Sequence, residues 1–141
     1  MSIAGKNALI SGATSGIGKE TALALADMGA NVCLIGRDQS KTENLCELIS
    51  QRSSDATVDY LLADLSSQVA IRELAAQYQA KHGALDILVN NAGALFAKRV
   101  ESVDGFEYTW ALNHLNYFLL TTLLKENLVA APEARVINVE S

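Results

Sequence analysis

The stretch Asn7-Ala8-Leu9-Ile10-Ser11-Gly12-Ala13-Thr14-Ser15-Gly16-Ile17-Gly18 decides the fold of this 141-residue chain. It opens with a short apolar run, residues 7–11, that ends at a glycine, which is typical of a buried strand. Three glycines follow, and a helical pattern that Gly29 closes comes directly after them. The residues expected on the buried face of this helix are Ile17, Thr21, Ala24, Leu25 and Met28. The stretch therefore predicts a strand, a tight turn and a helix in succession.

The remainder of the chain continues the alternation of strands and helices. We expect further strands at residues 32–35, 57–62, 85–90 and 135–139. Ser40-Lys41-Thr42-Glu43 predicts a capping box at the start of the second helix. Ser66 or Ser67 is expected to cap the third helix. The segment Asp104-Gly105-Phe106-Glu107 is expected to start a long apolar helix that runs to about residue 129.

This series with short connections predicts an α/β fold of the Rossmann type. We expect a doubly wound parallel sheet with strand order 3-2-1-4-5, covered by helices on both faces, with ligands at the carboxyl ends of the strands. Residues 1–141 are interpreted as one domain that is incomplete at its C-terminus and truncated before the last strands of the sheet.

Gly12, Gly16 and Gly18 indicate a phosphate-binding turn. Glycines let the backbone approach a pyrophosphate and let the helix pack closely on the strand, while the free amides and the dipole of the helix N-terminus receive the negative charge. The alternative is an ordinary turn between a strand and a helix. The position of the glycines at the start of a βαβ unit favours a dinucleotide cofactor.

The end of the second strand indicates which dinucleotide is bound. An NAD site places an acidic side chain there, to hold the ribose 2′-hydroxyl. This chain has Gly36 at that point and then Arg37, which can form a fork with a 2′-phosphate. Asp38 comes two positions too late and is interpreted as part of the turn into the next helix. The sequence thus predicts NADP, with a solvated surface role for Arg37 as the alternative.

Composition excludes several classes of function. The net charge of −5 argues against a nucleic-acid partner, which requires a basic surface. No apolar run is long enough for a membrane span, and the first residues lack the core of a signal peptide, so we expect a cytoplasmic protein. Cys33 and Cys46 are interpreted as reduced structural thiols, and no metal site is predicted.

The motifs resemble those of the short-chain dehydrogenases/reductases over the whole chain. The stretch from Ser11 to Gly18 is similar to the family's Thr-Gly-x-x-x-Gly-x-Gly, with serine in place of the first threonine. Other matches are Asp64-Leu65 for the pair that contacts adenine, Asn90-Asn91-Ala92-Gly93 for Asn-Asn-Ala-Gly, Asn113 for the catalytic asparagine, and Val136 to Ser141 for the strand that delivers the catalytic serine. Residues 113–121 are most similar to retinol-dehydrogenase-like and related bacterial members.

The resemblance implies an NADP-dependent oxidoreductase that transfers a hydride between NADP(H) and a small-molecule carbonyl or alcohol substrate. It implies that Ser141 holds the substrate oxygen and that Asn113 supports a water-linked proton relay. The implied cofactor-binding residues are Gly12, Thr14, Ser15, Gly16, Ile17, Gly18, Arg37, Asp64, Leu65, Asn91, Ala92 and Gly93.

One family motif is missing from these 141 residues. The family has a Tyr-x-x-x-Lys pair after the serine, and none of Tyr60, Tyr78, Tyr108 and Tyr117 is followed by lysine at the fourth position. We therefore expect this chain alone to be inactive. Two hypotheses remain. The chain is either the N-terminal part of an oxidoreductase or a non-catalytic NADP-binding module, and the end of the chain directly after a strand favours the first hypothesis.

The apolar long helix and an uncovered fifth strand predict a homo-oligomer.

Overall fold

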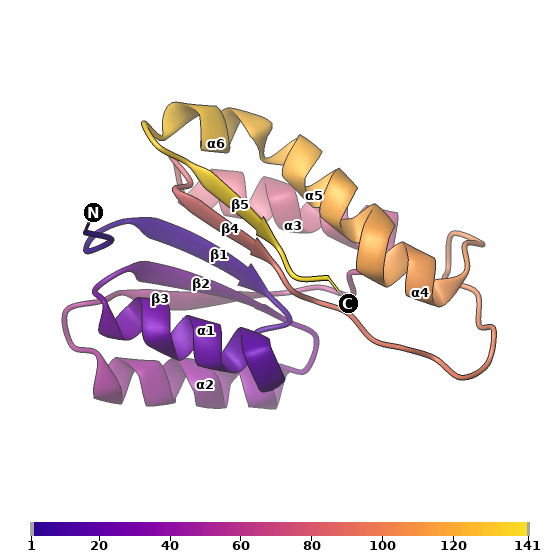
Figure 1. Cartoon of the computed structure of the whole chain (residues 1–141), viewed down its shortest axis with the longest axis horizontal. Coiled ribbons are helices and arrows are strands. Elements are labelled where there is room, and N and C mark those ends of the chain that lie inside the picture. Colours follow the sequence, from indigo (N-terminus) through magenta and orange to yellow (C-terminus); the bar gives the residue numbers. More distant parts are fainter. Residues whose placement is uncertain (1, 141) are drawn as a thin grey trace.

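The structure is a computed structural model that describes residues 2–140, so Ser141, the expected catalytic serine, lies outside the described residues. The elements follow one another as strand and helix along the chain (Figure 1). Their bounds are β1 Asn7–Ser11, α1 Gly16–Asp27, β2 Asn31–Gly36, α2 Gln39–Arg52, β3 Val58–Leu62, α3 Gln68–Lys81, β4 Ile87–Asn90, α4 Tyr108–Trp110, the π-helical segment η1 Ala111–Leu115, α5 Asn116–Leu123, α6 Lys125–Ala130 and β5 Arg135–Asn138.

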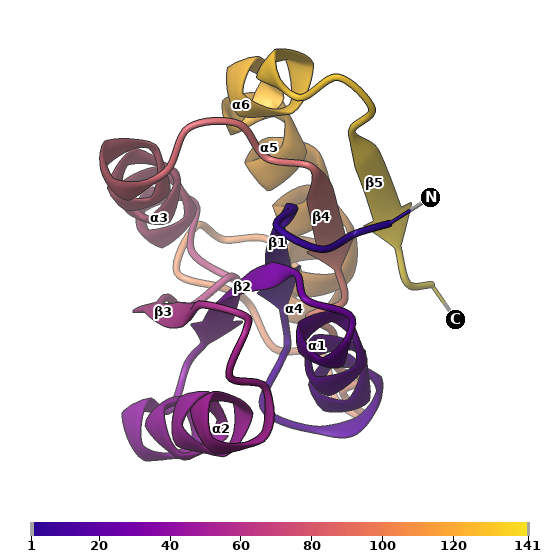
Figure 2. The same ribbon diagram turned by 90° about the vertical axis from the view of Figure 1, so that its left-hand side faces the viewer.

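The five strands form one sheet in the order β3-β2-β1-β4-β5, and every pairing is parallel. Helices α1 and α2 cover one face, while α3 and the α4–α6 segment cover the other (Figures 1 and 2). The predicted Rossmann-type sheet and its strand order are confirmed. Parallel strands must be joined by crossover connections, and here each crossover is a helix flanked by short turns. These short connections leave few possible strand orders.

The sheet separates two apolar cores. Between the sheet and α1/α2 lies a core that includes Ile10, Leu34 and Val89. Between the sheet and α3/α5 lies a second core that includes Leu9 and Leu88. Neighbouring residues of one strand thus enter opposite cores, as the alternation of a strand requires. Because both faces of β1 are buried, Ala8, Leu9 and Ile10 form a continuous apolar run rather than an alternating pattern.

The buried face of α1 differs from the expectation. The helix buries Gly18, Ala22, Leu23 and Ala26, whereas Ile17 is 65% and Met28 59% exposed. The predicted face was wrong, since Thr21 and Leu25 are only partly buried and Ala24 is exposed. Three of the four buried residues are Gly or Ala, and these small residues let the helix lie close to the sheet.

The cap of α2 is also a correction. The helix begins at Gln39, and Asp38 caps it by accepting a hydrogen bond from the Lys41 amide at 3.0 Å. The predicted capping box at Ser40 is wrong, because Ser40 already lies inside the first turn. For α3 the cap is Ser67, whose hydroxyl accepts from the Ala70 amide at 3.3 Å, one of the two predicted alternatives.

The predicted long helix is interrupted twice. It passes from α4 through the π-helical η1 into α5, and it breaks again at Leu124 before α6. Its cap is Glu107, which accepts from the amides of Thr109 at 3.0 Å and Trp110 at 2.8 Å, and these bonds lower the pKa of the Glu107 carboxyl. Asp104 instead accepts from the Gln68 amide at 2.8 Å and ties this loop to α3.

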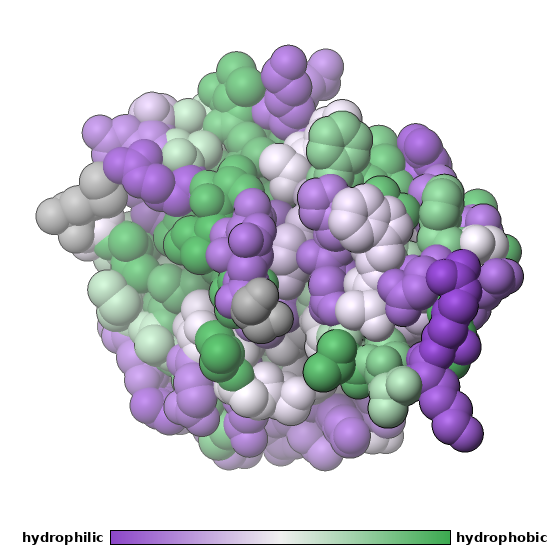
Figure 3. Space-filling model, turned by 45° about the vertical axis from the view of Figure 1, so that its right-hand side comes forward, coloured by the Kyte–Doolittle hydropathy of each residue, from purple (hydrophilic) through white to green (hydrophobic). Residues whose placement is uncertain are grey.

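Part of the apolar surface is uncovered. All four residues of β5 are exposed, and β5 forms one edge of the sheet. In the view of Figure 3, hydrophobic residues form several patches separated by polar ones. The helices formed by residues 2–140 include none with the length and apolar character that crossing a bilayer requires.

Candidate functional site

A cleft of about 360 Å³ lies where the carboxyl ends of β1, β2, β3 and β4 meet. It brings together segments that follow four different strands. Of the residues expected from the sequence, those that line it are Gly12, Thr14, Arg37, Asp64, Leu65, Ala92 and Gly93. An open depression, which also includes Thr14, continues over the start of α1 and is lined by Ser15, Gly16 and Ile17.

Gly18 and Asn91 lie behind the cleft and shape it. The Asn91 side chain donates from Nδ2 to the Gly12 carbonyl at 3.1 Å. Gly18 packs so closely that an added Cβ would overlap the Gly12 carbonyl oxygen, and a Cβ on Gly12 itself would lie 2.8 Å from the Ala92 Cα. Gly12 also has φ +63°, which favours glycine. The turn can therefore pass under the start of α1 only with glycine at both positions.

The Ser11 hydroxyl joins this turn to the end of β4. Ser11 is fully buried, and its Oγ accepts hydrogen bonds from the amides of Asn91 and Ala92, each at 3.0 Å. One side chain at the end of β1 thus satisfies two backbone donors of the neighbouring strand's loop. The two walls of the cleft are held in a fixed relation by this contact.

The N-terminus of α1 faces the cleft with its amides available. Ser15 is the N-cap residue, and its side chain makes no capping hydrogen bond. The first amides of a helix have no partner within the helix, and they carry the positive end of its dipole. This arrangement suits an anion such as a pyrophosphate.

The end of β2 has no room for an acidic side chain. A Cβ on Gly36 would overlap the Thr42 hydroxyl, which is held in place by donating to the Asp38 carbonyl at 2.7 Å. Arg37 is exposed, and its Nη1 lies 3.5 Å from the Tyr108 hydroxyl across the cleft. Asp38 belongs to the turn into α2, as its capping bond shows. The charged group that lines the cleft after β2 is consequently a guanidinium.

Asp64 lies at the same edge, after β3. Its Oδ1 accepts from the Ser66 amide at 3.0 Å and from the Ser66 hydroxyl at 2.6 Å, which fixes the loop. Leu65 beside it is buried and forms part of the α3-side core. These two residues present one polar and one apolar surface to the cleft.

Asn113 lies in the π-helical segment η1 and is bonded to the loop after β4. Its Nδ2 donates to the Ala94 carbonyl at 2.7 Å, and its Oδ1 accepts from the Ala94 amide at 3.0 Å. A Cβ on Gly93 would overlap that Oδ1. Asn113 therefore clamps the segment that lines the cleft, next to the other predicted residues. π-Helical turns are frequent at functional sites.

Sequence reasoning missed two aromatic residues of the cleft. Phe96 and Tyr108 line its far side, with ring centroids 4.7 Å apart and the planes at 70°. Both lie in or beside the irregular segment between β4 and α4, which carries no periodic pattern. Nothing in the sequence indicates that these two residues lie near Arg37.

Known proteins share this architecture. The family model described as short chain dehydrogenase matches residues 6–141. Retinol dehydrogenase 13 of Homo sapiens is 41% identical over 139 residues, which make up 99% of this chain and 42% of that protein. Retinol dehydrogenase 12 of Mus musculus is 42% identical over 139 residues, or 99% of this chain and 44% of that protein. The chain spans less than half the length of either relative.

Solved structures with the same fold also match this chain. The Pseudomonas aeruginosa RhlG/NADP active-site complex has a TM-score of 0.87 and 34% identity, covering 99% of this chain and 56% of that one. A metagenomic short-chain oxidoreductase in complex with NADP has a TM-score of 0.86 and 30% identity, covering 100% of this chain and 64% of that one. Together with the glycine turn and the strand order, the match of residues 6–141 shows that the chain belongs to the short-chain dehydrogenase family of oxidoreductases.

Proposed function

We propose that residues 1–141 form the NADP-binding part of an oxidoreductase that transfers a hydride between NADP(H) and a carbonyl or alcohol substrate. The observation that carries this proposal is the single cleft that unites the glycine turn, Arg37, Asp64 and the Asn91–Gly93 segment. The two NADP complexes with the same fold support it. In this proposal the chain forms one Rossmann-type domain, and its cytoplasmic location stays a prediction.

The cofactor is proposed to lie along the cleft. The amides at the start of α1, beside Thr14, Ser15, Gly16 and Ile17, would receive the pyrophosphate. Arg37 would bind the 2′-phosphate, because a guanidinium forms a charged fork with phosphate oxygens. The remaining residues would shape the rest of the pocket, with Asp64 and Leu65 at the adenine and Asn91, Ala92 and Gly93 lining the wall after β4.

The reaction needs a proton donor besides the cofactor. Bound NADPH supplies the hydride, and Ser141 is proposed to hold the substrate oxygen. Both amide atoms of Asn113 are bonded to Ala94, and Asn113 is proposed to support a water-linked proton relay. No tyrosine of these 141 residues has the family's spacing to a lysine, and a non-catalytic NADP-binding module is the second candidate.

Titration calorimetry with NADPH and NADH tests the binding proposal. One charge-assisted pair contributes roughly 1.5–3 kcal/mol, so NADPH should bind on the order of ten to a hundred times more tightly than NADH. Equal or tighter binding of NADH would refute the NADP assignment.

An NADPH-oxidation assay with a panel of aldehydes, ketones and retinoids tests the catalytic proposal. Loss of the acid/base group alone lowers a rate by about 10²–10⁴-fold, so the 141-residue chain should read at background. Reading the coding DNA downstream of Ser141 separates the two candidates. An in-frame Tyr-x-x-x-Lys identifies the enzyme, and a stop codon identifies the binding module. Robust turnover by the 141-residue chain would contradict the expectation of inactivity.

A further inference from the structure

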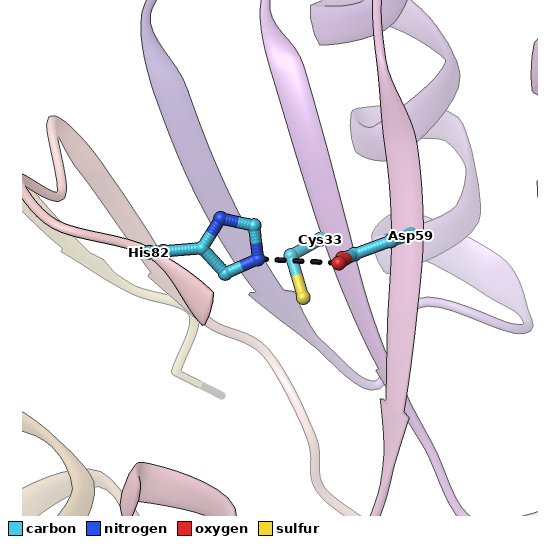
Figure 4. A group of neighbouring side chains, drawn as sticks. All are labelled: Cys33, Asp59 and His82. Carbon is cyan, nitrogen blue, oxygen red and sulfur yellow. Dashed lines mark hydrogen bonds and ion pairs between the residues drawn. The ribbon is translucent and has the colours of Figure 1, made fainter. Parts of the chain in front are cut away.

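Three side chains of metal-ligating types meet at the amino ends of the strands, at the end of the sheet opposite the cofactor cleft. Cys33 lies on β2, and its register partner on β3 is Asp59. His82 directly follows α3, as its C-cap residue. Figure 4 shows the imidazole of His82 in contact with the carboxylate of Asp59, with the Cys33 side chain next to them. Residues far apart in the sequence thus form one cluster, which sequence reasoning missed.

The distances within this cluster fit a small tetrahedral ion. His82 Nε2 lies 3.2 Å from Asp59 Oδ2, and the ligand atoms of the three residues all lie within 4.8 Å of one another. Bonds of about 2.0–2.3 Å from zinc to N, O and S place neighbouring ligands roughly 3.3–3.8 Å apart. Only small side-chain adjustments would be needed to bring the three atoms around one Zn²⁺.

The cluster is held in place from two sides. The His82 ring stacks on the buried ring of Tyr78, with centroids 4.7 Å apart, and the His82 amide donates to the Tyr78 carbonyl at 2.8 Å. Cys33 is fixed by its strand and is 3% exposed. An ion would therefore meet ligands that are already oriented, which lowers the entropic cost of binding.

An independent observation points to a missing partner. The second oxygen of Asp59, Oδ1, is buried and has no hydrogen-bond partner among residues 2–140. A buried carboxylate oxygen without a partner is costly. A cavity of about 150 Å³ lined by Cys33, Asp59, Tyr78 and His82 lies beside it, with room for an ion and a water.

We propose that Cys33, Asp59 and His82 form a binding site for Zn²⁺, with water as the fourth ligand. One thiolate and one imidazole select zinc over magnesium or calcium, which prefer all-oxygen ligands. On binding, the Cys33 thiol releases its proton to the solvent while sulfur bonds to the metal. The ion would join β2, β3 and the end of α3 at the amino ends of the strands, so its role is structural and separate from the cofactor.

Cobalt provides the direct test, because Co²⁺ replaces Zn²⁺ and gives a thiolate-to-metal charge-transfer band. The purified, reduced chain should bind one equivalent of Co²⁺ with this band, Zn²⁺ should remove it, and saturating NADPH should leave the affinity unchanged. Cys33→Ser should abolish the band. Asp59→Asn and His82→Gln should each weaken binding at least about tenfold.

Matched controls come from the same chain. Cys46 packs against the other core, on the α1/α2 side of the sheet, and His114, which lies in η1, stacks on Trp110. Cys46→Ser and His114→Gln should bind Co²⁺ as the unmutated chain does. Absence of the band in the unmutated chain, or a His82→Gln variant with unchanged affinity, overturns the proposal.

If the Cys33→Ser variant does not fold, thermal unfolding of the unmutated chain provides a second test. Zn²⁺ should raise the unfolding temperature of the unmutated chain relative to a chelator, because a ligand that binds only the folded state stabilises it. The same comparison with His82→Gln, altered at a partly exposed position, should show a much smaller rise. Equal unfolding temperatures of the unmutated chain with Zn²⁺ and with chelator overturn the proposal.

Discussion

The buried hydroxyl of Ser11 joins the two walls of the cofactor cleft. Ser11→Ala would leave the amides of Asn91 and Ala92 without their acceptor. An unsatisfied buried donor costs about 1–3 kcal/mol, so the free energy of unfolding should fall by about that amount in urea titrations. Ser11→Thr, which keeps the hydroxyl, should lose much less. An equal loss in both variants would show that the hydrogen bonds are not the cause.

Arg37 provides a test of cofactor choice that leaves the fold untouched, because its side chain is exposed. Arg37→Gln should weaken NADPH binding roughly ten- to a hundredfold, through loss of the charged pair, and should leave NADH binding almost unchanged. Calorimetry with both cofactors measures the two effects. A parallel loss for both would mean that Arg37 does not contact the 2′-phosphate.

The substitution Gly36→Asp is a poor test of the preference for NADPH over NADH. Its Cβ would overlap the Thr42 hydroxyl, so loss of NADPH binding in that variant would report a displaced α2 as readily as a changed charge. Replacing Thr42 by glycine in the same chain would remove the overlap. The double variant is therefore the appropriate form in which to introduce an acid at this point.

The sequence predicts which residues surround the cleft better than it predicts what each one does. Glycines and strand ends identify the cleft, because the carboxyl ends of parallel strands meet at one edge. The double bond from Asn113 to Ala94 could not be predicted, since it depends on a π-helical turn and a loop conformation. The Cys33–Asp59–His82 cluster could not be predicted either, because register between strands, not spacing along the chain, brings it together.

The start of α2 allows two capping assignments to be compared directly. Asp38→Ala removes the hydrogen bond to the Lys41 amide and should lower the free energy of unfolding by about 1 kcal/mol. Ser40→Ala should change it by less than about 0.5 kcal/mol, as expected for an exposed residue without a capping role. Thermal unfolding without cofactor measures both. A larger effect from Ser40→Ala would restore the capping box.

Strands and their order were predictable, whereas details of the helices were not. Strands β1, β2 and β4 contain short apolar runs between turns, and short connections leave few possible topologies. The buried face of α1 depends on how close the helix must come to the sheet at Gly18, which hydrophobicity alone does not reveal. The interruptions after Trp110 and at Leu124 could not be predicted, because the local sequence has neither glycine nor proline there.

The exposed apolar surface bears on how the molecule associates. Large hydrophobic residues are exposed along the segment from α4 to β5, namely Trp110, Phe118, Val129, Val136 and Ile137. An uncovered edge strand and exposed apolar residues both favour association. Sedimentation velocity of the 141-residue chain at micromolar concentration should therefore show a dimer or larger species.

Two substitutions test which part of that surface is responsible. Val136→Lys places a charge on the edge strand β5, and Phe118→Glu places one on α5, where Phe118 is 68% exposed. At least one should shift the sedimentation profile toward the monomer. A monomeric unmutated chain at the same concentration would contradict the prediction of a homo-oligomer.

The π-helical segment at residues 111–115 has a consequence for changes in chain length. A π-turn accommodates one residue more than an α-turn, and each residue of an α-helix rotates the chain by about 100°. Deleting one residue there would let the helix close as a regular α-helix while the residues before it kept nearly the same angular phase. Tyr108 would stay opposite Arg37, and only the residues of the turn itself would change position. This segment should therefore tolerate deletion of one residue better than the regular turns of α5, where the same deletion would rotate everything before it by about 100°.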